Sequence, residues 1–395
     1  MKVAILGSTN SRNAGGIYNI AYMFGHSLSA INKTDVQFFM HDDEYSAEDK
    51  LSYAPLPMHS YTVKGLKKLG YTTDLYGLLD KFKPDVIHTL GIWLYFSAVN
   101  KKYSSKTNTP YVIAPQGMLD PWQLKQSFSK DLKKKIALTL YERANLNHAT
   151  CIQALCKSEY ESIRAFGLKN PVAIIPNAID LPEITSRNNY DTVPYRWDVC
   201  KGRKTLLFLS RIHAKKGLDN LLQGWALTKP ASHNWQLVIA GETKDTEYMQ
   251  SLVDATKKYG ITETVQFIGG QFGENKKTCF IDADAFILPS FSEGLPMAVL
   301  EAWSYNLPSL LTSFCNLPEG FTENAAMQIE PTAESIAAGI NKMASMDETT
   351  LSAMAKNGYK LVEEKFNWQA VAKSSVQLYE WMRGKAEKPA FVFND

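Results

Sequence analysis

The sequence predicts an α/β fold made of two successive doubly wound domains, and three observations support this prediction. Short apolar runs alternate with longer amphipathic segments through the first half of the chain. The segment 181–203 interrupts this alternation with polar residues and two prolines, and the alternation then restarts. Near-continuous apolar strands separated by helices are typical of parallel sheets covered on both faces. We therefore expect one domain over residues 1–185 and a second over residues 186–366.

The expected strands are short and rich in β-branched and aromatic residues. In the first domain they cover 2–7, 36–40, 85–90, 111–116, 149–154 and 172–176, with helical patterns at 17–31, 66–82, 121–147 and 157–166. In the second domain they cover 205–210, 235–241, 264–270, 285–289, 308–313 and 326–330, with helices between them. Two helices follow, at 348–364 and 367–385, and we expect the last one to pack back on the first domain.

Composition narrows the class of protein. The 395 residues suffice for about two domains, and the 45% hydrophobic and 21% charged residues are ordinary for a soluble globular protein. A net charge of +3 does not indicate a nucleic-acid partner. No apolar run approaches the roughly 20 residues of a membrane span, and the start MKVAILGSTN is too briefly apolar for a signal peptide. The five cysteines form no C-x-x-C pair, so we expect a reduced, cytoplasmic protein.

The stretch FSEGLPMAVLEAW (291–303) places one glutamate in a glycine-proline turn and a second inside a predicted helix. Glu293 follows the carboxyl end of strand 285–289, where open α/β sheets bind ligands, and Gly294 permits close approach of the backbone. Pro296 suits the first position of a helix that extends to about residue 306. Ionised carboxylates such as Glu293 and Glu301 accept hydrogen bonds from sugar hydroxyls. Alternatively, Glu293 only complements the helix dipole and Glu301 is a surface residue.

A second group of charges follows strand 205–210. The stretch FLSRIHAKKGLDNLL (208–222) places Arg211 and Lys216 at a strand-to-helix junction of the same domain. Fixed cations beside a helix start can neutralise a diphosphate, although a lone pair of this kind is more often solvated. The cations and the glutamates follow different strands but are expected at the same edge of one sheet.

With these motifs the chain resembles the retaining glycosyltransferases of family four, which have the GT-B fold of two Rossmann-like domains facing across a cleft. The resemblance extends over nearly the whole chain and is specific in its combination of motifs: E-G-L-P-x-x-x-L-E-A, S-R-x-x-x-K-K-G, I-P-N-A-I-D (175–180) and V-Q-F-I-G (265–269). It implies a nucleotide-sugar donor, UDP- or GDP-linked, that binds mainly to the second domain without a metal ion. The acceptor would bind to the first domain.

The resemblance also implies individual roles. Glu293 would contact the donor sugar and Glu301 the ribose, while Arg211 and Lys216 would bind the diphosphate and stabilise it as the leaving group. The further donor-binding residues that it implies are Gly15, Gly16, Gln116, Ile268, Gly269, Gly294, Leu295, Pro296 and Met297.

In the first domain, the stretch YVIAPQGMLDPW (111–122) is similar to a subgroup of surface-polysaccharide enzymes. Many relatives have histidine at the position of Gln116, and a second histidine is frequent at Leu90. Gln116 can still donate or accept a hydrogen bond but cannot carry charge. His88 is as consistent with a core position as with a ligand contact, and Asp120 and Asn177 border the expected cleft without an assigned role.

Two other patterns allow both a structural and a functional interpretation. Asp282-x-Asp284 resembles a metal-binding pair of another transferase fold, but it immediately precedes a buried strand, so a structural role is favoured. In the helix 122–148 an apolar stripe is expected to pack on the first domain, and an excess of lysines either is solvated or contacts anionic lipid. The stripe comprises Leu124, Phe128, Leu132, Ile136 and Leu140; the cations are Lys125, Lys130, Lys133, Lys134, Lys135 and Arg143, against Asp131 and Glu142.

The expected function is therefore transfer of a sugar from a nucleotide donor to a glycan acceptor, lipid-linked, in cell-surface polysaccharide biosynthesis at the inner face of the plasma membrane. Two alternatives are another GT-B enzyme, such as a sugar-nucleotide epimerase, and a non-catalytic partner subunit of a polysaccharide assembly complex. The retention of Arg211, Lys216, Glu293 and Glu301 argues against a non-catalytic subunit.

Overall fold

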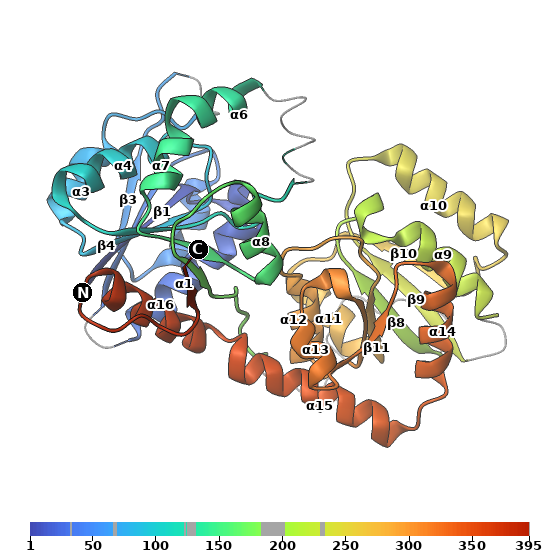
Figure 1. Cartoon of the computed structure of the whole chain (residues 1–395). Helices are drawn as coiled ribbons and strands as arrows, with labels where there is room; N and C mark the ends of the chain where they lie inside the picture. Colours follow the sequence, from blue (N-terminus) through green and yellow to red (C-terminus); the bar gives the residue numbers. More distant parts are fainter. Residues whose placement is uncertain are drawn as a thin grey trace. The chain divides into compact units, whose positions relative to one another are not determined.

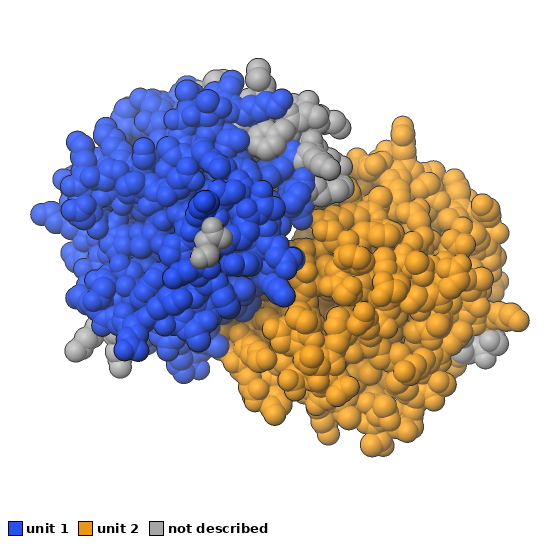
Figure 2. Space-filling view, viewed as in Figure 1, with its two compact units in different colours: residues 1–177, 368–395 blue, residues 178–367 orange. Residues whose placement is uncertain are grey.

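The computed structural model describes residues 1–31, 34–65, 69–121, 124, 132–182, 202–229 and 234–394. The chain forms two compact units, each built on its own β-sheet (Figures 1 and 2). Unit 1 consists of residues 1–177 and 368–395, and unit 2 of residues 178–367. The expected α/β class with two largely parallel-sheet domains is confirmed. The predicted linker 181–203 lies almost entirely outside the described residues.

Unit 1 contains a sheet with the strand order β14-β7-β6-β5-β4-β1-β2-β3. All neighbours pair in parallel except β14, which is antiparallel to β7. Two of these strands, β3 and β14, were not predicted, because β3 has one buried residue and β14 has two residues in all. The strands are β1 (Lys2–Thr9), β2 (Asp35–His41), β3 (Met58–Tyr61), β4 (Val86–Leu90), β5 (Tyr111–Ala114), β6 (Cys151–Ala154), β7 (Val172–Ile174) and β14 (Val392–Phe393).

The helices of unit 1 include the last long helix of the chain, α16, which packs on α1. Tyr379 Oη of α16 lies 2.6 Å from Nδ1 of His88 on β4, and His88 is 1% exposed. His88 is therefore a core histidine. The described helices are α1 (Gly16–Ser29), α2 (Ser46–Asp49), α3 (Leu75–Phe82), α4 (Phe96–Thr107), α6 (Leu132–Ala137), α7 (Arg143–His148), α8 (Lys157–Ala165) and α16 (Trp368–Met382).

Unit 2 contains a fully parallel sheet with the order β10-β9-β8-β11-β12-β13. Its strands are β8 (Lys204–Leu209), β9 (Trp235–Ala240), β10 (Val265–Gly269), β11 (Ala285–Leu288), β12 (Ser309–Thr312) and β13 (Ala326–Ile329). Its described helices are α9 (Leu218–Leu227), α10 (Thr246–Lys258), α11 (Gly273–Asp282), α12 (Met297–Ser304), α13 (Pro318–Thr322), α14 (Ala333–Ala344) and α15 (Glu348–Lys365).

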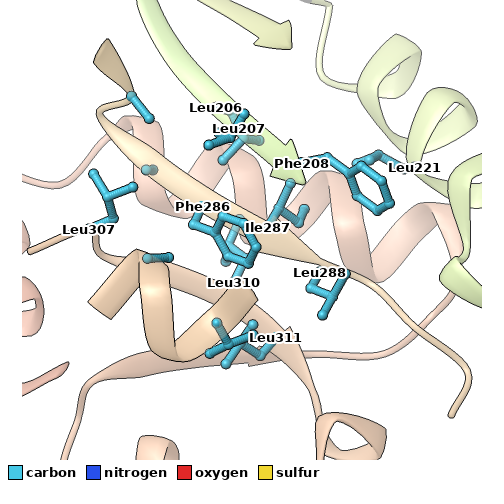
Figure 3. Close-up of a cluster of buried hydrophobic side chains, with 14 of the residues drawn as sticks. Leu206, Leu207, Phe208, Leu221, Phe286, Ile287, Leu288, Leu307, Leu310 and Leu311 are labelled. Carbon is cyan, nitrogen blue, oxygen red and sulfur yellow. The ribbon is translucent and has the colours of Figure 1, made fainter. Parts of the chain in front are cut away.

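The strands β8, β11 and β12 contribute a large part of the core of unit 2 (Figure 3). Phe208, Phe286 and Leu310 are fully buried, and so is Trp303 of α12. Burial of one such side chain stabilises the fold by about 1.5–3 kcal/mol. This packing holds the carboxyl ends of β8 and β11 side by side, which positions the loops that follow them.

The segment 121–147 differs from the expected single helix. Its described part is α6, a π-helical turn η4 (Leu138–Glu142) and α7. The predicted packing stripe is wrong at Ile136 and Leu140, which are 44% and 72% exposed. The wider π-helical turn breaks the four-residue repeat, so other residues face the core. These buried residues are Ala137, Glu142, Asn145 and Leu146.

Glu142 therefore does not belong to the surface charge of this helix. Its carboxylate is fully buried and accepts hydrogen bonds from the Trp93 N–H (2.7 Å) and from Nδ2 of Asn145 (3.1 Å). Burial raises the pKa of Glu142. Several members of the predicted stripe and lysine cluster lie outside the described residues or side chains: Lys125, Phe128, Lys130, Asp131, Leu132, Lys133 and Lys134. None of the described helices is long and apolar enough to cross a bilayer.

Candidate functional site

The loop that follows β8 carries the two predicted cations. A 3-10 turn, Ala214–Lys216, is capped by His213, whose Nδ1 accepts a hydrogen bond from the Lys215 N–H. Gly217 has a φ of +74°, and a Cβ atom there would lie 2.2 Å from the carbonyl oxygen of Pro289. Only glycine fits this close contact. The loop after β8 is thereby fixed against Pro289, the residue that follows β11.

Lys216 and Glu293 are in direct contact. The Lys216 ammonium donates to both carboxylate oxygens of Glu293, at 2.6 and 2.8 Å, and the side chains are only 10% and 9% exposed. The Ser290 hydroxyl also donates to Glu293 Oε1, at 2.6 Å. An enclosed pair of this kind is stronger than a solvated one. The solvated and dipole-only alternatives therefore do not describe Lys216 and Glu293.

Residues outside the predicted motifs hold the turn that carries Glu293. The Glu293 N–H donates to the Phe314 carbonyl, and Nδ2 of Asn316 donates to the carbonyls of Glu293 (2.6 Å) and Gly294 (3.2 Å). Asn316 has a φ of +56°, a conformation that asparagine tolerates better than most residues. An asparagine before a leucine-proline pair was the available signal, and sequence reasoning missed it.

Glu301 lies on α12, which begins at Met297 with Pro296 as its N-cap, one position later than predicted. Its Oε1 accepts a hydrogen bond from Lys276 Nζ of α11, at 2.5 Å. Its Oε2 is buried and has no hydrogen-bond partner in the described part of the chain. A buried acceptor without a partner costs about 1–3 kcal/mol, so this oxygen is suited to receive a donor group from a ligand.

The other predicted donor-binding residues of unit 2 differ in how far they are exposed. Arg211 is exposed and makes no hydrogen bond or ion pair within the described residues. Gly269 is exposed at the end of β10, with a φ of +71°. The Ile268 carbonyl accepts a hydrogen bond from Nε2 of Gln271. Gly294, Leu295 and Met297 are half-buried around the start of α12. Arg211 is thus an exposed cation of this loop, Lys215 a half-buried one and Lys216 the enclosed one.

Unit 1 contains the remaining predicted residues. Gly15 has a φ of +61° and Gly16 begins α1; both are exposed, and a Cβ atom at either would meet nothing within 4 Å. The loop before them is held by the Asp43 carboxylate, which accepts from the hydroxyls of Thr9 (2.7 Å) and Ser11 (2.6 Å). Burial opposes ionisation of Asp43, but these hydrogen bonds lower its pKa overall. The β1–α1 connection is therefore fixed, with open space beside its glycines.

Gln116 is held at both ends. Its Oε1 accepts from Nδ2 of Asn177 at 2.8 Å, and its backbone has a φ of +55°. The next N–H, of Gly117, donates to Oε1 of Glu159 at 2.6 Å, and the Leu155 N–H donates to the other oxygen at 2.7 Å. Glu159 is 4% exposed, and burial raises its pKa. Leu90, by contrast, is a core residue, 2% exposed.

Asp284 has a structural role at the opposite edge of the unit 2 sheet. Its Oδ2 accepts a hydrogen bond from the Thr205 N–H at 2.8 Å, which ties the start of β11 to the start of β8. Within the described residues, no group of three or more histidine, cysteine, aspartate or glutamate side chains is arranged to hold a metal ion.

The arrangement defines a class of protein: a two-domain α/β chain whose second parallel sheet presents cations and carboxylates together beyond its carboxyl ends, where such folds bind ligands. Two family models match the chain, Glycosyl transferases group 1 over residues 196–361 and Glycosyl transferase 4-like domain over residues 30–178. The chain belongs to the group 1 glycosyltransferases, with the GT-B architecture of two Rossmann-like domains.

Individual relatives agree with this family. An uncharacterized glycosyltransferase of Methanocaldococcus jannaschii is 29% identical over 180 residues, 45% of each chain. A human protein, one of the subunits of phosphatidylinositol N-acetylglucosaminyltransferase, is 23% identical over 246 residues, 62% of this chain and 48% of that protein. These matches thus span about half the length of the curated relatives. The solved structure of Anabaena HepE in complex with UDP and glucose has a TM-score of 0.70 at 16% identity, over 96% of this chain and all of the other.

Proposed function

We propose that this chain is a retaining, metal-independent glycosyltransferase that moves a hexose from a UDP- or GDP-sugar to a glycan acceptor. The observation that carries the proposal is the contact between Lys216 and Glu293, which joins a cation after β8 to a carboxylate after β11. A nucleotide sugar needs both kinds of group, because a diphosphate requires cations and a sugar requires hydrogen-bond acceptors. The family supports the reaction type, and the solved HepE complex is an example of a neighbour with bound UDP.

In this proposal unit 2 binds the donor. Arg211 and Lys216 bind the diphosphate, Glu293 accepts hydrogen bonds from the sugar, and Glu301 accepts them from the ribose through its unpartnered Oε2. Gly294, Leu295, Pro296 and Met297 form the backbone wall beside the donor, and Ile268 and Gly269 lie against the base.

The chemical step is a displacement at the anomeric carbon. The bond from that carbon to the β-phosphate oxygen breaks, and the acceptor oxygen forms its bond on the same face of the sugar. The acceptor proton passes to the departing diphosphate. Arg211 and Lys216 stabilise the negative charge that develops on the diphosphate, which is often the largest contribution to catalysis. No covalent intermediate with the protein is needed.

Unit 1 takes the acceptor side, and Gly15, Gly16 and Gln116 contribute to donor binding. Gln116 accepts from Asn177 with its carbonyl oxygen and donates to Asn177 Oδ1 with one N–H of its amide, at 3.4 Å, which leaves the second N–H for a sugar hydroxyl. The acceptor is a lipid-linked glycan of cell-surface polysaccharide synthesis; the human relative acts, by its name, on phosphatidylinositol. Exposed Ile136 and Leu140 beside Lys135 form a surface suited to the inner face of the plasma membrane.

Release of nucleoside diphosphate from a panel of UDP-, GDP-, ADP- and dTDP-sugars tests the proposal. Slow release from one donor, faster with a lipid-linked glycan extract and lost in Glu293→Ala, is the expected result. Glu274→Ala is the matched control, because Glu274 is an exposed acid of the same unit. Isomerisation of the donor without diphosphate release would instead establish an epimerase. If no donor is bound or consumed, the enzyme proposal fails and a partner-subunit role replaces it.

A further inference from the structure

Lys276 lies outside every motif that the sequence analysis used, yet it is the partner of Glu301. Its ammonium donates to Glu301 Oε1 at 2.5 Å, and the two side chains are 31% and 25% exposed. Lys276 is the fourth residue of α11, which follows β10, and Glu301 is the fifth residue of α12, which follows β11. The ion pair therefore links α11 to α12, beside the proposed donor-binding residues of unit 2; the two helices are labelled in Figure 1.

The geometry leaves the two oxygens of Glu301 in different states. Oε1 is engaged by Lys276, whereas Oε2 is buried and lacks a partner among the described residues. A carboxylate held through one oxygen cannot turn freely about its last bond, so the direction of the other oxygen is fixed as well. A buried acceptor fixed in direction is already arranged for a hydroxyl donor before a ligand arrives.

The ion pair is not what holds the two helices together. Phe280 of α11 stacks on Tyr305, at the end of α12, with ring centroids 5.4 Å apart, and Phe280 is 2% exposed. A partly exposed ion pair contributes little to stability in general. The position of Lys276 is therefore better explained by the orientation of Glu301 than by folding.

We propose that Lys276 is a positioning residue of the donor site: it orients Glu301 so that Oε2 receives a ribose hydroxyl of a nucleoside diphosphate. This inference rests on the proposed function and deepens it, because it makes discrimination between ribose and deoxyribose a property of the Lys276–Glu301 pair. The charge of Lys276 also balances that of Glu301, which would otherwise repel the diphosphate.

Calorimetric titration tests the inference with pairs of nucleoside diphosphates that differ only in the sugar. UDP, GDP and ADP would be compared with their 2′-deoxy and 3′-deoxy counterparts. We expect the wild-type chain to prefer the ribonucleotide roughly tenfold or more, since a hydrogen bond to a charged group contributes about that ratio. Lys276→Met should abolish most of this preference, and Lys276→Arg should retain it.

The matched control is Lys277→Met. Lys277 is the next residue of α11 and is also paired, with Glu274, but both side chains are largely exposed. This control should bind the nucleotides as the wild-type chain does. The melting temperature should be unchanged in Lys276→Met, Lys276→Arg and Lys277→Met. Glu301→Gln should lose the preference too, and Lys276→Met should lower it no further in that background.

The possible results distinguish failure of the positioning role from failure of the proposed function. If the wild-type chain prefers the ribonucleotide and Lys276→Met keeps that preference, the positioning role is wrong while donor binding stands. The same conclusion follows if the wild-type chain binds the ribonucleotides and their deoxy counterparts equally. If no nucleoside diphosphate binds to the wild-type chain, the proposed function itself fails.

Discussion

Charged residues of the proposed donor site differ in how firmly their neighbours hold them. Lys216 and Glu293 form an enclosed pair, with Ser290 as a third member, whereas Arg211 is exposed and makes no hydrogen bond in the described structure. A ligand that binds near Glu293 must share Lys216 with it, but Arg211 can meet a diphosphate without breaking an existing bond. Arg211 is therefore the residue whose removal reports most directly on diphosphate binding.

Arg211→Ala should weaken binding of the nucleotide-sugar donor more than tenfold. Arginine binds phosphate through charge-assisted, bidentate hydrogen bonds worth about 1.5–3 kcal/mol. Calorimetric titration measures the change. Arg203→Ala is the control, because Arg203 precedes β8 at the opposite edge of the same sheet and should leave affinity unchanged. Equal affinity in Arg211→Ala and the wild-type chain would contradict the diphosphate assignment.

His88 makes the stability of unit 1 depend on pH. Burial lowers the pKa of His88 to about 3, whereas the unfolded chain has the ordinary value near 6.5. Between these values only the unfolded state binds the proton, so stability falls as pH decreases from about 6.5 towards 3. The slope contributed by His88 is roughly 1.4 kcal/mol per pH unit.

Chemical denaturation of the wild-type chain and His88→Asn across this pH range measures that slope. The variant should be less stable near pH 7 but should depend less on pH, by about one proton. Tyr379→Phe is the control, because it removes the hydroxyl beside Nδ1 and keeps the histidine. Parallel curves for His88→Asn and the wild-type chain would show that another group is responsible.

At the scale of elements, the segment α6–η4–α7 shows how one π-helical turn changes which residues meet the core. The turn places Glu142 inside, where it accepts the Trp93 N–H, and leaves Ile136 and Leu140 outside. A four-residue repeat cannot express that change, because the repeat assumes regular α-helical geometry.

Two substitutions in this segment should therefore differ strongly in their effect on the free energy of unfolding. Leu140→Ser should change the free energy of unfolding by less than about 0.5 kcal/mol, as exposed positions do. Leu146→Ala should lower it by about 2–5 kcal/mol, because Leu146 is fully buried. Urea denaturation measures both. A large loss of stability in Leu140→Ser would instead show that Leu140 is buried.

The same exposed residues test membrane contact. The double variant Ile136→Ser with Leu140→Ser should bind vesicles containing an anionic phospholipid more weakly than the wild-type chain, since both apolar contacts are lost. Vesicle sedimentation measures the bound fraction. Leu51→Ser is a matched control, as Leu51 is also 72% exposed but lies on another part of unit 1. Equal binding by all three proteins would contradict the proposed surface.

At the scale of the whole molecule, the two-domain α/β architecture was predictable from the alternation of apolar strands and helices, which has clear periodicity. In unit 2 the sequence predicted that Lys216 and Glu293 lie at the same edge of one sheet, but it did not predict their direct contact. Lys276 and Asn316 were missed because their roles depend on hydrogen bonds to residues 25 and 23 positions away. Ser290 was missed because a serine that follows a predicted strand carries no distinctive pattern, although Glu293 is only three residues further on. Short elements such as β14 have too few residues to carry a pattern.

Because each unit has its own sheet and core, ligand binding should be detectable separately in each. A nucleoside diphosphate that lacks the transferred hexose should protect amide hydrogens of unit 2, chiefly in residues 210–217 and 290–301. A ligand at 100 times its dissociation constant stabilises the state that binds it by about 2.7 kcal/mol. Hydrogen exchange with and without the diphosphate would locate this protection.

In Arg211→Ala the protection should disappear at the same ligand concentration, while exchange of the unit 1 sheet stays as in the wild-type chain. Loss of exchange protection across both units would indicate a folding defect in the variant and not a lost contact. Protection by the diphosphate confined to residues 1–177 would place the nucleotide site on unit 1 and contradict its assignment to unit 2. In that event the charges after β8 and β11 would need another ligand, and Lys216 and Glu293 would have to be explained as a structural pair.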